Sequence, residues 1–269
     1  MSNLLMYCLS LNDEDYNKIK TLKYIPVGLG NNKFNSNWLR DNTNENISNK
    51  NSFYGEYTFH YWFWKNKLTE INEETWIGFC AYRRFWASQK NIATINSIKD
   101  FLQNVPDDWN NYDVILGQNI FMDGWSKMRI IKHGLRSFIL KPKYFLKKNQ
   151  NLKLHFDSFH GFGNLDKAIE MLEDNDKEDF KFFMENQNYY NRGNMFIIKN
   201  KKLIDSFYNT VFPWLERCEK IFGFKKAEYG NTRIYAFLME RFISYWFNKY
   251  SKVKIWPVIF YDLNKESFY

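Results

Sequence analysis

Two adjacent arginines, Arg83 and Arg84, follow an apolar segment, residues 75–80, that has the composition of a buried strand. In open α/β sheets, ligands collect at the carboxyl ends of the strands. A guanidinium group pairs with two phosphate oxygens at once and stays charged at any working pH. The pair therefore predicts a site for a diphosphate at this strand end. Two surface arginines in contact with solvent are the alternative.

A short segment, residues 154–161, brings together groups that could accept a proton from a hydroxyl. Such a transfer requires a carboxylate or an imidazole within hydrogen-bond reach. We expect this segment to form a loop, in which Asp157 and His160 are candidate catalytic groups and His155 is a further candidate. The same consideration makes His60 a candidate, although a lone histidine is commonly a structural residue with satisfied hydrogen bonds.

Glu240 is the first candidate for this general base, ahead of Asp157. A helix predicted over residues 232–249 advances by about 100° per residue, which places Arg233, Glu240 and Ser244 in one narrow strip. Apolar residues border the strip on both sides, so an ionised group there should be paired or functional. A buried pair of Glu240 with Arg241 or Arg233 is the alternative to a catalytic role.

Two pairs of aspartates have a spacing that could hold a divalent cation against a nucleotide diphosphate. Asp13 and Asp15 follow the first predicted strand and are the better candidates for a Mg²⁺ or Mn²⁺ site. Asp174 and Asp176 lie in an acidic run, residues 173–179, that we interpret as a solvated turn. The sequence leaves the use of a metal open and makes no cofactor certain.

Residues 124–156 contain nine lysines and arginines and no acidic residue, whereas the whole chain has a net charge of +8. The rest of the chain is therefore close to neutral. A block of this kind is typical of a surface that faces lipid headgroups, nucleic acid or a diphosphate-linked substrate, or of a solvated face. We expect it to dock on an anionic membrane surface through residues 127–153. The nine cations are Lys127, Arg129, Lys132, Arg136, Lys141, Lys143, Lys147, Lys148 and Lys153.

Composition indicates a folded protein of a reducing compartment. The 269 residues are 45% apolar and 25% charged, which argues against a disordered chain. Cys8, Cys80 and Cys218 are far apart and lack the C-x-x-C spacing of zinc sites. No signal peptide and no run of about 18 apolar residues is present. We therefore expect a cytoplasmic protein, peripheral on the inner face of the cytoplasmic membrane.

Strand-like and helical segments alternate along the chain, which predicts an α/β fold with a mixed central sheet flanked by helices in a single domain. Aromatic residues make up 20% of the chain, either from a coding bias or because the fold presents rings to flat substrates. The motifs of P-loop, dinucleotide-binding, hydrolase and zinc-protease sites are absent from the sequence. Strands are predicted over residues 4–11, 24–30, 75–80, 112–116, 194–199 and 255–261, a long loop over 31–52, and helices over 52–66, 95–104, 165–172, 202–222 (interrupted at Pro213) and 232–249.

Several segments together resemble a bacterial family of capsular-polysaccharide and lipopolysaccharide synthesis proteins. That family was long labelled only as a domain of unknown function and is regarded as glycosyltransferases. The resemblance spans residues 5–260, but Ala81 stands where the family has histidine and Asn44 where a glycine is expected. The segments that carry it are Asp41-Asn-Thr, Asn46-Ile-Ser48, Asn51, Glu56-Tyr-Thr58, Tyr61-Trp62, Trp64-Lys65-Asn66 and Gly78-Phe-Cys-Ala-Tyr-Arg-Arg-Phe85, with weaker matches at Tyr24 to Gly28, Gly193 to Ile197 and Glu240 to Phe242.

The resemblance implies a GT-A-like, Rossmann-like fold and transfer of a sugar, galactofuranose or another hexose, from a UDP-sugar to a capsular or lipopolysaccharide glycan, free or lipid-linked. We expect inversion at the transferred sugar. About residues 1–120 would bind the nucleotide sugar and about residues 121–269 the acceptor. On the donor side the resemblance places Asp41, Asn46, Asn51, Glu56, Tyr82, Arg83 and Arg84. Nearer the reacting centre, or supporting it, the resemblance places Asn194, Glu240 and Arg241. One of Tyr61, Trp62 and Trp64 could stack on a uracil or sugar face, with Trp62 assigned to the acceptor or to support, and we expect at least two of the three to pack in the core.

Two other classes of function remain open. A non-catalytic glycan- or lipid-binding module would use the aromatic residues and the basic block but would need no nucleotide site. An RNA-binding protein would use the same block, with Phe138, Tyr144 and Phe145 as stacking partners. The RNA-binding hypothesis leaves Arg83 and Arg84 unexplained, so we do not expect a nucleic-acid partner.

Overall fold

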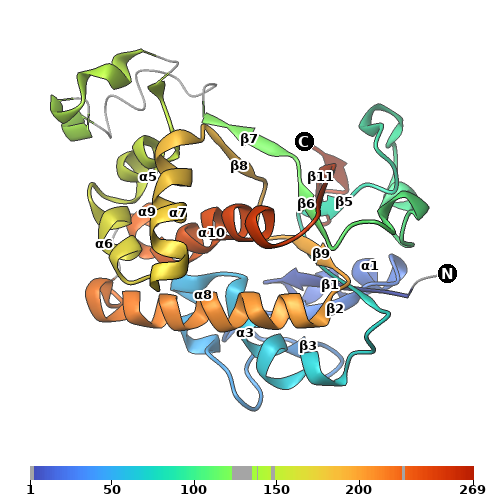
Figure 1. Cartoon of the computed structure of the whole chain (residues 1–269). Helices are drawn as coiled ribbons and strands as arrows, with labels where there is room; N and C mark the ends of the chain where they lie inside the picture. Colours follow the sequence, from blue (N-terminus) through green and yellow to red (C-terminus); the bar gives the residue numbers. More distant parts are fainter. Residues whose placement is uncertain (1–2, 123–134, 138, 147–148, 226–227) are drawn as a thin grey trace. The chain divides into compact units, whose positions relative to one another are not determined.

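The computed structural model describes residues 3–122, 135–137, 139–146, 149–225 and 228–269 (Figure 1). The chain divides into two compact units. The first unit consists of Met1–Gln118, Arg192–Tyr208 and Phe247–Tyr269, and the second of Asn119–Asn191 and Asn209–Trp246. The first boundary lies close to residue 120, where the two functional halves were expected to meet, but two later segments return to the first unit. In the described part of the chain, no helix is long and apolar enough to cross a bilayer.

The first unit is built on a mixed sheet of ten of the described strands, with the order β10-β6-β9-β4-β1-β2-β3 and β5, β11 and β12 attached beyond β4. β4, β1, β2 and β3 are mutually parallel, β10 is parallel to β6, and β9 is antiparallel to both β4 and β6. The carboxyl ends of these parallel strands therefore lie at one edge of the sheet, together with the residues that precede β9. The bounds are β1 Leu4–Ser10, β2 Ile25–Gly28, β3 Leu39–Arg40, β4 Trp76–Ala81, β6 Val114–Gly117, β9 Phe196–Ile198 and β10 Val253–Trp256.

A hairpin extends the sheet beyond β4. Ala81 pairs with Arg84, so Tyr82 and Arg83 form the turn between β4 and β5 (Arg84–Trp86). β5 pairs with β11 (Val258–Asp262), which pairs in turn with β12 (Ser267–Phe268). The single strand predicted over residues 255–261 is thus two strands, β10 and β11, separated at Pro257. A proline has no N–H to donate to a ladder, so the chain changes its pairing partner there.

Aromatic rings fill the space between the sheet and α3 (Tyr57–Asn66). The Tyr7 ring of β1 lies 5.4 Å from that of Phe59 and 5.3 Å from that of Phe63, and Phe79 of β4 lies 5.9 Å from Tyr7. Phe196 of β9 continues this layer, 5.1 Å from Phe79. Tyr7 and Phe79 are partners in the β1–β4 register, and side chains of directly paired residues lie on the same face of a sheet, which is why the two rings share this face.

The opposite face of the sheet is covered by a second cluster that is rich in tryptophan. Trp76 of β4 lies 5.6 Å from Trp109, which lies 5.1 Å from Trp256, measured between ring centroids. Figure 1 shows α1 (Tyr16–Thr21), which contributes Ile19 to the same cluster, beside β1 and β2. The high aromatic content therefore serves the core of this unit to a large extent.

The second unit is mainly helical. Its core contains Phe180, whose ring lies 5.8 Å from that of Trp214 and 5.2 Å from that of Phe242, and the Trp214 indole donates to the carbonyl of Ala168. A two-stranded antiparallel sheet, β7 with β8, belongs to the same unit. The elements are β7 Asn119–Phe121, α5 Leu152–His160, α6 Asn164–Glu170, α7 Asp174–Asn186, β8 Tyr189–Asn191, α9 Tyr229–Thr232, and residues 209–222 and 234–246 of α8 (Lys201–Phe222) and α10 (Ile234–Tyr250).

The prediction of a loop over residues 154–161 is wrong, because this segment is most of α5. Asn151 caps the helix by accepting a hydrogen bond from the Leu154 N–H at 2.9 Å. Gly161, with φ of +92°, follows the last helical residue. An asparagine before a helix and a glycine after it are common boundary signals, and both were present in the sequence.

Two further local predictions are wrong. Residues 95–104 form only a single 3₁₀ turn, Ile98–Asp100, in which the Asp100 carboxylate accepts from the backbone N–H groups of Asn96 and Ser97. The acidic run of residues 173–179 is the start of α7 and not a solvated turn. Carboxylates are favourable in the first turn of a helix because they face its unpaired N–H groups.

The predicted helix of residues 202–222 is continuous where an interruption was expected, and the predicted helix of residues 52–66 is interrupted where it was expected to be continuous. α8 continues through Pro213, although a proline inside a helix destabilises it by about 3 kcal/mol. The side chains of Trp214 and Leu215 are fully buried, and the burial of each stabilises the fold by about 2–3 kcal/mol, which offsets this cost. The predicted helix of residues 52–66 is interrupted at Gly55, with φ of +59°, between α2 (Asn51–Tyr54) and α3.

Two glycines of the central sheet, Gly117 of β6 and Gly78 of β4, provide a test of how tightly the sheet is packed. A Cβ on Gly117 would lie 2.8 Å from the backbone oxygen of Arg192, which cannot move alone. A Cβ on Gly78 would lie 2.7 Å from the flexible end of Met6. We expect Gly117→Ala to lower the free energy of unfolding by about 2–3 kcal/mol and Gly78→Ala to lower it less, as measured by urea denaturation. A larger loss in Gly78→Ala would contradict this packing.

Candidate functional site

Asp41 is the first residue after β3 and lies at the carboxyl edge of the sheet. Its buried carboxylate accepts hydrogen bonds from the Gly30 N–H at 2.8 Å and from the Thr58 hydroxyl at 2.6 Å. The Asn51 amide also donates to the Thr58 hydroxyl, at 3.1 Å. Burial raises the pKa of Asp41, and the bonds from Thr58 and Gly30 oppose this rise. These contacts make Asp41 a residue that fixes the loops after β2 and β3.

The loop after Asp41 has a defined geometry. Asn44, near which a glycine was expected, adopts a φ of +49°, in the left-handed region that glycine favours and asparagine tolerates. The Asn46 side chain accepts from the Ser48 N–H and hydroxyl at 3.1 and 2.9 Å. Trp62, which is only 5% exposed, donates to the Thr43 carbonyl at 2.9 Å. Trp62 thus supports this loop from the core.

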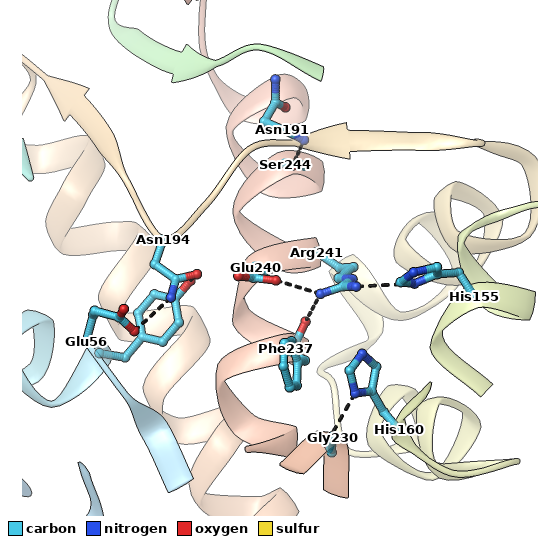
Figure 2. Close-up of polar contacts among 11 residues, drawn as sticks. Glu56, His155, His160, Asn191, Asn194, Gly230, Phe237, Glu240, Arg241 and Ser244 are labelled. Atoms are coloured by element: carbon cyan, nitrogen blue, oxygen red, sulfur yellow. Dashed lines mark hydrogen bonds and ion pairs between the residues drawn. The ribbon is translucent and has the colours of Figure 1, made fainter. Parts of the chain in front are cut away.

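Asn194, immediately before β9, links that part of the edge to the start of α3. Its amide nitrogen donates to the Glu56 carboxylate at 2.9 Å (Figure 2), and the Tyr57 hydroxyl donates to its amide oxygen at the same distance. Gly193 has a φ of +81° and allows the chain to turn before Asn194. These contacts bring together two landmarks that lie 138 residues apart.

Arg83, in the turn of the β4–β5 hairpin, has an acidic partner that sequence reasoning missed. Its Nε donates to Asp262 at 3.0 Å, and its guanidinium lies 5.0 Å from the centre of the Tyr82 ring. The Arg83 side chain is nevertheless 50% exposed, so its Nη groups can still reach a ligand. Asp262 is 179 residues away in the sequence and carries no local signal of this role.

Arg84 differs from its neighbour. It is half-buried at the start of β5, and its Nη1 lies 3.6 Å from the position that a Cβ on Gly193 would take. Within the described ranges of the chain, Arg84 has no acidic side chain within ion-pair distance. No acidic side chain of the described residues therefore neutralises its positive charge at the carboxyl edge.

The proposed metal ligands Asp13 and Asp15 have separate partners. Asp13 accepts from the backbone and the side chain of Asn35 at 2.9 and 3.0 Å, whereas Asp15 is buried and accepts from the Ser10 hydroxyl at 2.5 Å. Burial raises the pKa of Asp15, which disfavours its charged form. Among the described residues, no group of three acidic, histidine or cysteine side chains could hold a metal. These residues do not fit a divalent cation.

A pocket of about 520 Å³ in the second unit gathers three of the predicted site residues. They are Asp157, His160 and Arg241, and the second buried histidine, His155, lies beside them. Glycine and aromatic residues form much of the remaining wall. The full lining is His155, Asp157, Ser158, Phe159, His160, Gly161, Phe162, Tyr190, Glu228, Tyr229, Gly230, Asn231, Phe237 and Arg241.

Arg241 is the centre of the polar contacts in this pocket (Figure 2). It is 2% exposed, and its Nη1 donates to the Glu240 carboxylate at 2.7 Å and to the Phe237 carbonyl at 3.3 Å. Its Nη2 lies 3.4 Å from Nδ1 of His155, and its guanidinium lies 4.3 Å from the centre of the Tyr190 ring. The Glu240–Arg241 pair that the sequence offered as an alternative to a catalytic Glu240 is therefore present.

The two histidines of the pocket are neutral at pH 7. Burial lowers the pKa of His160 to about 3, and burial together with the Arg241 charge holds the pKa of His155 well below its usual range. The Gly230 carbonyl can only accept, so Nδ1 of His160, 3.1 Å away, carries the proton and Nε2 is an acceptor. Arg241 can only donate, so Nδ1 of His155 is an acceptor and Nε2 carries the proton.

Asp157 has the electrostatic setting of a general base. It is 6% exposed, and burial raises its pKa to about 6 although the Lys153 ammonium, 3.9 Å away, opposes this rise. Lys153 is shared, because it also pairs with Asp166. The Gly163 N–H donates to the Asp157 carboxylate at 3.2 Å. A carboxylate with a pKa near neutrality is well matched to proton transfer.

His60 lies in the core of the first unit. Its Nδ1 is 2.8 Å from the Tyr208 hydroxyl, its ring lies 4.2 Å from that of Phe79, and burial lowers its pKa to about 3. His60 is thus a structural histidine. The aromatic wall of the pocket, which includes Tyr190 and Phe237, was not predicted, because Phe237 meets His160 and Tyr190 meets Arg241 only in the folded chain.

Comparisons with known proteins identify the fold and the family. The chain is similar to the apo structure of the bifunctional glycosyltransferase WbbM, with a TM-score of 0.66 and 18% identity over 96% of this chain. This chain spans 45% of the length of that one. The predicted fold class, α/β and GT-A-like with a mixed central sheet flanked by helices, is thus confirmed. Residues 6–252 match the family described as a domain of unknown function, DUF4422, and the chain belongs to that family. A search of curated proteins found no match.

The raised pKa of Asp157 predicts a pH dependence of stability. A carboxyl whose pKa rises from 3.8 to about 6 on folding favours the folded state at low pH, and this contribution is lost as the pH rises from about 4 to above 6. The variant Asp157→Asn has no carboxyl at this position, so it should not show this loss of stability. We expect the free energy of unfolding, measured by urea denaturation, to fall between pH 5 and pH 7.5 by about 1–2 kcal/mol more in the wild type than in Asp157→Asn.

Asp174→Asn is the control for this measurement, because the Asp174 side chain is fully exposed and its replacement removes the same charge. Parallel pH profiles of the wild type and Asp157→Asn would contradict the assignment.

Proposed function

We propose that the protein is a glycosyltransferase that transfers a hexose, galactofuranose or another, from a UDP-sugar to a capsular or lipopolysaccharide glycan. The observation that carries the proposal is the guanidinium of Arg84, whose charge has no acidic partner among the described residues, at the carboxyl edge of an α/β sheet. This is the edge at which such sheets bind their ligands. The similarity in fold to a glycosyltransferase and the family membership support the proposal.

In this proposal, the first unit binds the donor. Arg84 holds the diphosphate, and Arg83 adds contacts through its Nη groups while Asp262 fixes its Nε. Glu56 and Asn194, which already pair with each other, offer hydrogen bonds to sugar hydroxyls. Asp41 acts indirectly, because its bonds to Gly30 and Thr58 position the loops at the edge. The donor roles of Asn46, Asn51 and Tyr82 stay predictions.

The second unit binds the acceptor and supplies the base. The acceptor oxygen forms a bond to the anomeric carbon of the donor, and the bond from that carbon to the UDP oxygen breaks. UDP leaves with the electron pair, and the hydroxyl proton passes to the Asp157 carboxylate, so the anomeric centre is inverted. We prefer Asp157 to Glu240 because Glu240 is engaged by Arg241, and to His160 because the pKa of His160 is lowered to about 3. A divalent cation remains a hypothesis without assigned ligands.

The donor site is tested by the binding of UDP to the full chain in titration calorimetry. Arg84→Ala should weaken binding about 10- to 150-fold, the equivalent of 1.5–3 kcal/mol for a lost charge-assisted hydrogen bond. Arg83→Ala should have a smaller effect, since its Nε is held by Asp262. Lys202→Ala removes a charge from the surface of α8 and is the control.

If the affinity for UDP is unchanged in the double variant Arg83→Ala with Arg84→Ala, the assigned donor site is wrong. If the wild-type chain does not bind UDP, the result favours the non-catalytic glycan-binding module.

We also propose that the protein docks on the inner face of the cytoplasmic membrane. Of the basic segment, Lys127, Arg129, Lys132, Lys147 and Lys148 lie outside the described residues, as does Phe138. In the described part, the exposed cations Arg136, Lys141 and Lys143 stand next to apolar side chains that are exposed by 55–68%. A basic surface with exposed apolar side chains suits an anionic bilayer, which attracts the charges and accepts the apolar groups. The apolar residues are Leu135, Ile139, Leu140 and Leu146.

Vesicle flotation tests this docking. The double charge reversal Lys141→Glu and Lys143→Glu should release the protein from vesicles that contain phosphatidylglycerol, because each cation near an anionic surface contributes about 1 kcal/mol. Ile139→Ser with Leu140→Ser should weaken binding to the same vesicles. UDP affinity should not change in either variant, which provides the control for folding. Binding that persists in both variants would contradict the docking proposal.

A further inference from the structure

We propose that the 520 Å³ pocket of the second unit binds a neutral sugar residue of the acceptor and does not bind the nucleotide. This inference rests on the proposed function and names the ligand class of the acceptor side. The evidence is the combination of an aromatic wall, a fixed set of hydrogen-bonding groups and an unfavourable balance of charge for a diphosphate.

The aromatic wall can contact the apolar faces of a sugar ring. Tyr229 and Phe162 are 67% and 39% exposed, and so are accessible to a ligand, whereas Tyr190 is only 8% exposed. Phe237 and His160 stack on each other with their ring centres 4.1 Å apart, which fixes both rings. Rings held rigidly in this way bind a flat, partly apolar face without a large loss of conformational freedom.

The polar groups of the pocket are fixed with defined donors and acceptors. In the neutral tautomers derived above, Nε2 of His160 is an acceptor, and Nε2 of His155 carries a proton but is buried. Arg241 is locked between Glu240 and His155 at 2.7 and 3.4 Å, and Asp157 is held by the Gly163 N–H. Hydroxyl groups of a sugar both donate and accept, so a wall that offers both kinds of partner suits them.

The charge balance argues against a nucleotide. Among the described residues that line the pocket, Arg241 is the one cation, and its charge is already paired with Glu240. Two acidic residues, Asp157 and Glu228, also line it, and the nearby Lys153 is shared between Asp157 and Asp166. The described lining therefore presents a net negative charge to a diphosphate, whereas the binding of an uncharged saccharide is not opposed by this charge.

The position of the pocket within the second unit suits a glycan that is held at a membrane. A smaller cavity of about 110 Å³ shares Asp157 and Phe162 with the pocket and is also lined by Leu140 and Lys141 of the exposed basic segment. The Arg136 guanidinium lies 4.6 Å from the centre of the Phe162 ring. A surface that faces lipid would therefore adjoin the pocket that takes the sugar.

Saturation-transfer NMR on the full chain tests this inference with a panel of neutral probes, the methyl glycosides of glucose, galactose, galactofuranose, mannose and N-acetylglucosamine. At least one probe should receive saturation, and UDP at saturating concentration should not displace it. Tyr229→Ala should reduce the affinity for that probe at least fivefold, and so should Arg241→Gln. Phe182→Ala is the matched control, because Phe182 is an aromatic residue of the same unit with the same 67% exposure but lies outside the pocket lining.

The outcomes separate this inference from the proposed function. If UDP binds and no glycoside does, or if the glycoside affinity is unchanged in both pocket variants, the inference is overturned while the donor site stands. Displacement of the glycoside by UDP would also overturn it. If a glycoside binds in the predicted way and UDP does not bind, the sugar site stands and the transferase proposal fails.

Discussion

The pairing of β4 with β1 on one side and with β9 on the other is the constraint on which the candidate donor site depends. The parallel pair brings the carboxyl ends of β1 and β4 to one edge, and the antiparallel β9 begins at that same edge. Arg84 therefore meets the segment around Asn194, more than 100 residues later in the chain. A one-residue shift of register would turn these side chains to the other face.

The two adjacent arginines have different surroundings. Arg83 lies in the hairpin turn and shares its charge with Asp262, whereas Arg84 begins β5 and has no acidic partner in the described chain. One reason for this difference is that successive side chains of a strand point to opposite faces of the sheet. The other is that β5 pairs with β11, which places Asp262 near the turn that contains Arg83. Charge that the protein leaves uncompensated at a strand end is available to a ligand.

The second unit relies on a buried polar network in place of exposed charge. Arg241 holds Glu240 on one side and His155 on the other, and it is buried among the rings of Phe156, Tyr190 and Phe237. In these surroundings ionisation is costly, so both histidines stay neutral and the pKa of Asp157 rises to about 6. The same burial that stabilises the helices thus sets the protonation states of the pocket.

The sequence alone determined the α/β alternation, most of the strands, the polar strip of the last long helix and the family, because these follow from local periodicity and from short motifs. It could not determine that residues 154–161 are helical or that Asp262 reaches Arg83, and it left open whether Glu240 pairs with Arg241. Only the tertiary structure decided those points. The partner of a charged group, and the solvent that it loses on folding, depend on residues far away in the chain, and local sequence carries no record of them.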